Sequence, residues 1–440
     1  MIQTQSPMDK EDYFFFTNRA LLPTSLITFS TYATIIGASS TVGLISLGAH
    51  WGFPACWWLL SGVLGLYLLR NFLLKPVFHY QIRTISDLIR LFYGKPAEII
   101  ATILICASWI AVISAQLIAC GKLAQHFFPV LPSSFFIPLS ALIIALYIFF
   151  FGQQAVFLTD LIQGLSIMIA LVLLSYSLFI RTDWRQLFES TGTFFYSPGI
   201  TWLETLSLIA VLVPLYLFGP DIFSRFLCAD KAVKARRSLF YASLIILPLA
   251  FIIPLIGMSG NLLFHIQNES LFFKLLDLLG SYARIVVIIG FLCAFLSSAD
   301  TSIMTATQLI TFNIIKRHSI PQARITLLFI TAIACIVAIY YQSIIQSLLM
   351  GYKLFSAGFT IPLLVPLITG KKYHYFSAIS VMITGAFWVI LSELSTLPIL
   401  GIILICNGIT IFFLTEYIIV PWIGKNDFHY CGFFSRENNS

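Results

Sequence analysis

Charged residues are scarce in this chain. Of its 440 residues only 10% are charged, whereas 59% are hydrophobic, and the mean hydropathy is +0.94. Soluble domains carry about a quarter of their residues as Asp, Glu, Lys and Arg, so this composition excludes a soluble globular protein. The class that it indicates is a multi-pass integral membrane protein.

Clustered cysteines and catalytic motifs are also missing. The eight cysteines lie singly, mostly inside apolar runs, and no two of them form a Cys-x-x-Cys pair. This pattern excludes a disulfide or metal framework and is typical of small core residues. The sequence contains no HExxH or GxSxG motif, and only a short polar tail follows the last apolar segment. We therefore expect no enzyme and no sensor with a soluble output domain.

Apolar segments long enough to cross a membrane dominate the rest of the sequence. A span needs about 20 apolar residues to cross about 30 Å of hydrocarbon, and twelve such segments occur. They fall at 21–47, 52–74, 97–121, 132–151, 155–180, 200–222, 237–262, 285–314, 322–342, 343–370, 375–394 and 397–423. Residues 1–19 are polar and mixed in charge, which predicts no removable signal peptide.

The basic residues lie in short loops between these segments. With the amino terminus inside, nineteen loop lysines and arginines fall on the inner side and five on the outer side. This bias predicts that both termini are cytoplasmic, and it explains the net charge of +7 without a nucleic-acid partner. One group is interpreted as a solvated inner loop that sets topology: Arg225, Lys231, Lys234, Arg236 and Arg237.

Two of the segments carry residues that interrupt a helix. The first has small and hydroxyl residues from Thr34 to Gly43, and the sixth has Pro214 in its middle and Gly219–Pro220 near its inner end. Interrupted helices in matching positions of two halves indicate the substrate site of a transporter, with freed carbonyls available for Na⁺. We predict an all-α fold with a 5+5 inverted-repeat core, in which helices 1 and 6 are broken, and two peripheral C-terminal helices.

This prediction divides the chain into four parts. They are a cytoplasmic N-terminal segment (1–20), a ten-helix transport core (21–370), two additional transmembrane helices (371–424) and a cytoplasmic tail (425–440).

The segment from Phe291 to Lys316 carries a run of small hydroxyl residues. Spacings of three, four and seven residues place one carbonyl and three hydroxyls on one helix face, at Ala294, Ser297, Ser298 and Thr301. Oxygen-only ligand sets suit hard cations. The alternative is that the serines bond back to the preceding turn or let helices pack closely.

Several stretches, in this order, resemble the sodium:solute symporter family, which has the fold of the bacterial leucine transporter. They are DYFFFTNRALL, YATIIGASSTVG, AVFLTDLIQG (155–164), GPDIFSRFLCADKAVKARRS (219–238), AFLSSADTSIMTATQLITFNI and GYKLFSAGFTIPLL (351–364). The resemblance extends from about Asp12 to Phe387. The extra helix that usually precedes the first core helix is lacking, which we interpret as a short form or a late start codon with an intact core.

The resemblance implies sodium as the coupling ion. Its ligands would be the backbone carbonyls of Ala33, Ile36 and Ala294 and the hydroxyls of Ser297 and Ser298.

Some relatives have a second cation site one turn further in. Asp160, Asp300 and Thr301 occupy comparable positions here. Two acids at that depth could hold Na⁺ or exchange a proton; alternatively, Asp160 lines the cytoplasmic exit and Asp300 caps a polar contact.

Lys353 is the residue from which we predict the kind of substrate. An ionisable group inside a membrane helix is a functional-site hypothesis, and a lysine suits a carboxylate. The alternatives are a side chain that snorkels to the outer interface or a pair with Glu204. The other residues expected to line a central substrate cavity are Thr34, Ser40, Gln116 and Tyr216, with packing or helix bonding as the alternative for the last two.

The predicted function is sodium-coupled secondary active symport of a small organic solute by alternating access, with an amino acid or a small carboxylate favoured. A proton-coupled transporter using Asp160 or Asp300 and a non-transporting membrane sensor are the alternatives. The expected partners are the solute, the sodium ion and the lipid bilayer, and the sequence does not fix the oligomeric state. We expect a multi-pass protein of a bacterial inner membrane.

Overall fold

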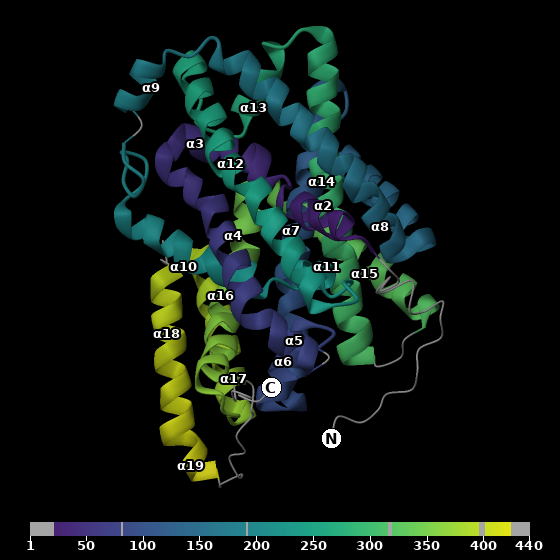
Figure 1. The fold of residues 1–440 in the computed structure, drawn as a ribbon, viewed down its shortest axis with the longest axis vertical. Coiled ribbons are helices and arrows are strands. Elements are labelled where there is room, and N and C mark those ends of the chain that lie inside the picture. Colours follow the sequence, from purple (N-terminus) through teal and green to yellow (C-terminus); the bar gives the residue numbers. More distant parts are fainter. Residues whose placement is uncertain (1–21, 81, 191, 316–318, 396–400, 424–440) are drawn as a thin grey trace.

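The computed structural model of the protein describes residues 22–423, apart from 81, 191, 316–318 and 396–400. Within these residues every regular element is a helix (Figure 1). Eleven helices are long and apolar enough to cross a membrane, and a bent pair supplies a twelfth span. The predicted helical class and number of spans are confirmed.

The bent pair is the first span. It consists of α2 (Thr24–Ile35), followed after a break by η1 (Ser39–Gly43) and α3 (Leu44–Trp51), and its two halves meet at 59°. The other spans are α4 with its flanking turns (Phe53–His79), α7 (Lys95–Phe127), the two parts of α8 (Ser133–Phe179), α10 (Trp202–Phe218) with α11 (Pro220–Phe226), α12 (Ala232–Phe264), α14 (Ser281–Leu309) with η4 (Ile310–Ile315), α15 (Ile320–Tyr341), α16 (Ile344–Thr369), α17 (Tyr375–Ser395) and α18 (Gly401–Leu414).

The long helix α8 contains two spans because it breaks at Gly152. This residue has φ 59° and ψ −149°, a left-handed conformation that glycine adopts without the steric penalty of a Cβ. The predicted boundary between the fourth and fifth spans lies at this point.

Short helices mark the two ends of the bundle and reflect its repeat. After the second span comes α6 (Ile85–Tyr93), at the lower end in Figure 1, and after the seventh comes α13 (Ser270–Asp277), at the upper end. Each half of the core thus begins with a broken span and carries a short helix between its second and third spans, on opposite sides. This is the order that an inverted repeat requires.

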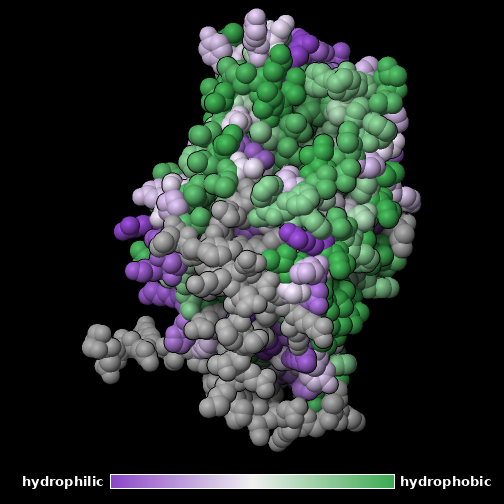
Figure 2. All heavy atoms as spheres, turned by 90° about the vertical axis from the view of Figure 1, so that its right-hand side faces the viewer, coloured by the Kyte–Doolittle hydropathy of each residue, from purple (hydrophilic) through white to green (hydrophobic). Residues whose placement is uncertain are grey.

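The outer surface of the spans is apolar. On the second part of α8, Leu158, Ile162, Leu165 and Ile169 are between 47% and 68% exposed, whereas Asp160 on the other face is fully buried. Hydrophobic side chains cover most of the described surface in Figure 2. A helix that is apolar outside and polar inside is suited to lipid around a polar centre.

The second break lies at Gly219, where α10 ends with φ −55° and ψ 122°. Pro220 begins α11 without an amide hydrogen, which is the position where a helix tolerates proline. Pro214 remains inside α10. The helix α14 packs against both broken spans and against α7 and α8, so the residues near both breaks meet at its centre. Helices α17 and α18 pack on α16 at one edge.

Candidate functional site

The break after α2 leaves backbone groups without partners in the helix, and side chains form hydrogen bonds with them. Gln116 on α7 accepts the amide hydrogen of Ala38 at 2.8 Å, and the Ser40 hydroxyl donates to the Ile35 carbonyl at 2.7 Å. Unpaired backbone groups at membrane depth are costly. Ser40 is fully buried and does not line the central cavity. In this structure its hydroxyl closes the break, and its role as a solute contact stays a prediction.

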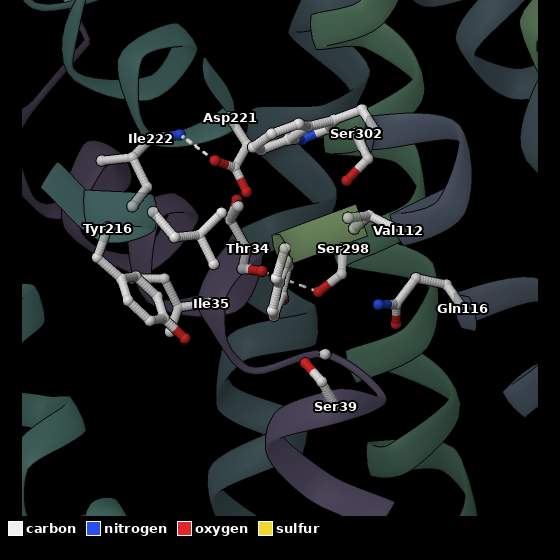
Figure 3. Close-up of a pocket in the computed structure, with 14 residues that line it drawn as sticks. Thr34, Ile35, Ser39, Val112, Gln116, Tyr216, Asp221, Ile222, Ser298 and Ser302 are labelled. Atoms are coloured by element: carbon white, nitrogen blue, oxygen red, sulfur yellow. Dashed lines mark hydrogen bonds between the residues drawn. The ribbon is translucent and has the colours of Figure 1, made fainter. Parts of the chain in front are cut away.

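The two serines of α14 face carbonyl oxygens at the end of α2. Ser297 donates to the Ala33 carbonyl at 2.9 Å and also lies 3.1 Å from the Ala294 carbonyl. Ser298 donates to the Thr34 carbonyl at 2.9 Å (Figure 3). The serine side chains are 0% and 4% exposed. The structure thus brings Ala33, Ala294 and both serines together.

Ile36, the remaining residue of the predicted sodium set, is the point at which α2 ends. Its φ and ψ are −90° and 73°, outside the helical range, and its amide still bonds to Tyr32. Because the helix stops here, the Ile36 carbonyl has no helical amide to pair with.

Gly37 permits the close approach of the break to α14. A Cβ on this residue would lie 2.3 Å from Ser298 Oγ and 3.0 Å from Gln116 Oε1. Real Cβ atoms do not approach other atoms so closely, so a larger residue would displace the serine hydroxyl or the glutamine.

The three residues of the predicted second cation or exit site also lie in the core. Asp160 is fully buried and accepts a hydrogen bond from Ser30 at 2.5 Å, and Asp300, equally buried, accepts one from Tyr147 at 2.6 Å. Thr301 bonds back to its own helix at 2.7 Å. Both acids are therefore held by hydroxyl donors from neighbouring spans.

Arg225 occupies the space between these groups. Its Nη2 lies 3.8 Å from the Asp160 carboxylate, and both side chains are fully buried. Its Nε donates to Thr34 Oγ1 at 3.2 Å, and its Nη2 donates to Thr301. The guanidinium carbon lies 5.1 Å from the centre of the Phe157 ring, a cation–π distance.

The interpretation of Arg225 as part of a solvated loop is wrong. The helix α11 continues to the next residue, Phe226, and carries the arginine side chain into the core. The sequence signal was present, since this arginine stands alone within the apolar run IFSRFL.

A small cavity lies between the broken helices, α7 and α14 (Figure 3). The space open to the centre of a water molecule is about 30 Å³, enough for about two or three waters. Three of the predicted substrate residues line it, namely Thr34, Gln116 and Tyr216, together with the aromatic rings of Trp109 and Tyr352.

Lys353 does not line this cavity. Its Nζ lies 3.7 Å from Glu393 on α17, and the two side chains are 28% and 31% exposed. Consecutive helix residues point in different directions, so Tyr352 faces the cavity and the lysine does not. Glu204, the alternative partner, instead caps α10 through Thr201. The structure therefore places Lys353 beside Glu393 and outside the cavity lining, and this position gives no support to the preference for a carboxylate.

Asp221 is a cavity residue that sequence reasoning missed. It lies in the first turn of α11, where its Oδ1 accepts the Ile222 amide hydrogen at 2.8 Å. Figure 3 shows its other carboxylate oxygen pointing into the cavity, on the side of Thr34. The available signal was an acid directly after the Gly219–Pro220 break.

Two broken spans around a polar cavity are typical of secondary transporters. The model of the sodium:solute symporter family matches residues 14–385, most of the chain, and the protein belongs to this family. It is accordingly a sodium-coupled solute symporter, and sodium is its coupling ion.

Solved structures share this fold. A Na⁺-coupled sialic acid symporter in its substrate-bound outward-open state has a TM-score of 0.76 at 13% identity, covering 94% of this chain and 93% of that one. A mutant manganese transporter of Eremococcus coleocola has a TM-score of 0.59 at 16% identity, covering 94% and 97%. Mhp1, a nucleobase-cation-symport-1 family transporter in a closed conformation, has 0.58 at 8%, covering 87% and 94%. At these identities the likeness is one of fold. No curated protein sequence matches the chain.

Proposed function

We propose that this protein moves a small organic solute together with sodium by alternating access, with the ion bound between α2 and α14. The proposed ligands are the carbonyls of Ala33, Ile36 and Ala294 and the hydroxyls of Ser297 and Ser298. The observation that carries the proposal is the 2.9 Å approach of both serine hydroxyls to carbonyl oxygens at the end of α2.

The chemistry of this oxygen cluster suits a hard cation. Its members are uncharged, nearly fully buried and supplied by two separate spans. A serine hydroxyl can rotate so that a lone pair, instead of the proton, faces the centre. An ion bound there would hold α2 against α14, and its release would free the two helices to separate. Sodium would thus favour one arrangement of the spans, which is the thermodynamic requirement for coupling.

Contacts at the lower side of the cavity supply one gate. Arg225 joins α11 to α8 through Asp160 and to α2 through Thr34. These helices include the lower halves of both broken spans. Opening the cavity downward, which the basic loops predict to be the cytoplasmic side, requires these contacts to break.

Contacts at the upper side supply the opposite gate. Lys122 near the end of α7 lies 2.5 Å from Glu269, which precedes α13. The other carboxylate oxygen of Glu269 accepts the amide hydrogens of Ile344 and Ile345, at 3.1 and 3.2 Å, where α16 begins. Alternating access requires that one of these two networks opens while the other stays closed.

The test is thermal unfolding of the purified protein in NaCl and in KCl. We expect sodium to raise the unfolding midpoint of the wild type, because a bound ion stabilises the folded state. The Ser298→Ala variant loses one contact to a charged ion, worth about 1.5–3 kcal/mol, so its sodium affinity should fall by about tenfold to a hundredfold.

The matched control is Thr307→Ala. It removes another fully buried hydroxyl of α14, whose bond is to the Ile303 carbonyl at 2.8 Å. This control should respond to sodium as the wild type does. An equal sodium response in Ser298→Ala would contradict the proposed ligand set.

A further inference from the structure

Acidic side chains outnumber basic ones around the central cavity. Asp160, Asp221 and Asp300 lie on three different spans that meet there, and among the described residues the guanidinium beside them is that of Arg225. Arg225 and one sodium ion supply two positive charges for these three carboxyl groups, so one carboxyl group is left to be protonated or to pair with a further cation. A charge left unbalanced at membrane depth is strongly unfavourable.

Of the three acids, Asp221 is the one open to the cavity. Asp160 and Asp300 are fully buried and bond to Ser30 and Tyr147, whereas Asp221 is partly accessible. Its Oδ1 is bonded to the Ile222 amide, and no partner of its Oδ2 is found in the described part of the chain. The Asp221 carboxylate therefore has an acceptor free for a bound molecule.

Arg225 follows Asp221 by one helical turn; its Nε and Nη2 are engaged elsewhere, and its buried Nη1 has no hydrogen-bond partner among the described residues. The guanidinium lies 3.8 Å from the Asp160 carboxylate and donates to Thr34 and Thr301. It belongs to the lower gate and does not line the cavity.

The remaining wall of the cavity also favours a positive charge. Trp109, Tyr216 and Tyr352 line it, and no lysine, arginine or histidine does so among the described residues. Aromatic ring faces attract cations, and such rings with one acidic group form an environment suited to an alkylated or primary ammonium. A carboxylate solute would instead add a second uncompensated negative charge.

We propose that the solute is a small organic cation, an amine or quaternary ammonium compound, whose positive group binds Asp221 between the aromatic side chains. This inference rests on the proposed symport and adds the chemical class of its substrate. With the three carboxylates ionised, Arg225, sodium and the cationic solute together leave the centre of the protein without net charge.

The experiment compares cations with uncharged molecules of the same shape. Thermal unfolding in NaCl is followed during titration with choline or ethanolamine, with 3,3-dimethyl-1-butanol or ethylene glycol as the uncharged counterparts, and with isobutyrate as an anion. We expect at least one cation to stabilise the wild type, with its uncharged counterpart at least tenfold weaker and no effect of the anion. This comparison needs no variant.

Two variants then test whether Asp221 supplies the negative charge that binds the cation. Asp221→Asn keeps the acceptor for the Ile222 amide and removes the negative charge, so it should bind the cation at least tenfold more weakly while still responding to sodium alone. The control is Asp230→Asn, an exposed acid in the turn after α11, which should bind the cation as the wild type does.

Three results would overturn the inference: no cation stabilises the wild type, the uncharged or anionic compounds bind as tightly as the cations, or Asp221→Asn retains wild-type affinity. Each of these leaves the proposed symport standing if sodium alone still stabilises the wild type and stabilises Ser298→Ala only at about tenfold or higher concentration. Loss of that sodium response is the separate result that refutes the proposed function.

Discussion

Replacing Arg225 by methionine tests the buried ion pair at the lower gate. The substitution removes the guanidinium that lies 3.8 Å from Asp160, and both side chains are fully buried. Breaking a buried pair by deleting one partner costs about 3–5 kcal/mol, because the remaining charge is left uncompensated. Ser30, the other donor to Asp160, supplies a hydrogen bond but no positive charge. We expect Arg225→Met to lower the free energy of unfolding by about this amount.

The double variant separates the charge effect from lost packing. Asp160→Asn combined with Arg225→Met also removes the carboxylate that the arginine pairs with, so it should be more stable than Arg225→Met alone. The control is Arg185→Met, which breaks an ion pair with Glu189 whose side chains are 88% and 68% exposed. Exposed pairs contribute about 0–1 kcal/mol.

The assay is denaturant unfolding of the purified variants in detergent, read as free energies. Two outcomes would refute the reasoning. One is an Arg225→Met protein as stable as the wild type, and the other is a double variant no more stable than Arg225→Met alone. Either would mean that the buried ion pair does not stabilise the folded protein.

Two further substitutions test the upper gate and the close approach at the break. Gly37→Ala adds a Cβ 2.3 Å from the present position of Ser298 Oγ, so the serine hydroxyl must move. We expect this variant to lose the sodium-dependent rise in the unfolding midpoint. An unchanged rise would show that the serine does not hold the ion. Glu269→Gln weakens the contact to Lys122, 2.5 Å long, and should open the upper side. In a background without other reactive cysteines, Tyr352→Cys should then react at least severalfold faster with an impermeant thiol reagent added from outside, and an equal rate would exclude this contact as a gate.

The spans and their breaks could be predicted from the sequence because, in a membrane, both depend on residues that are close together in the chain. A span must be a long apolar run, and a break needs residues such as Gly219–Pro220 that cannot continue a helix. Helix spacing likewise placed Ser297 and Ser298 on one face. These predictions depend on residues close in the chain, and the fold agrees with them.

The direction of single charged side chains could not be predicted in this way. Lys353 and Tyr352 are neighbours, yet which of them faces the cavity depends on the rotation of α16 against α7 and α17. Arg225 looked like part of a loop because the length of α11 is set by packing in the core. Asp221 was missed for the same reason, although its place beside the second break was visible in the sequence.

The most direct test of the sodium site is binding of radioactive ²²Na⁺ to the purified protein. We predict saturable binding to the wild type and to Thr307→Ala, and a loss of at least a hundredfold in affinity when Ser297 and Ser298 are both replaced by alanine. Wild-type binding by that double variant, or solute uptake into liposomes driven by a proton gradient without sodium, would contradict sodium coupling at the break of α2.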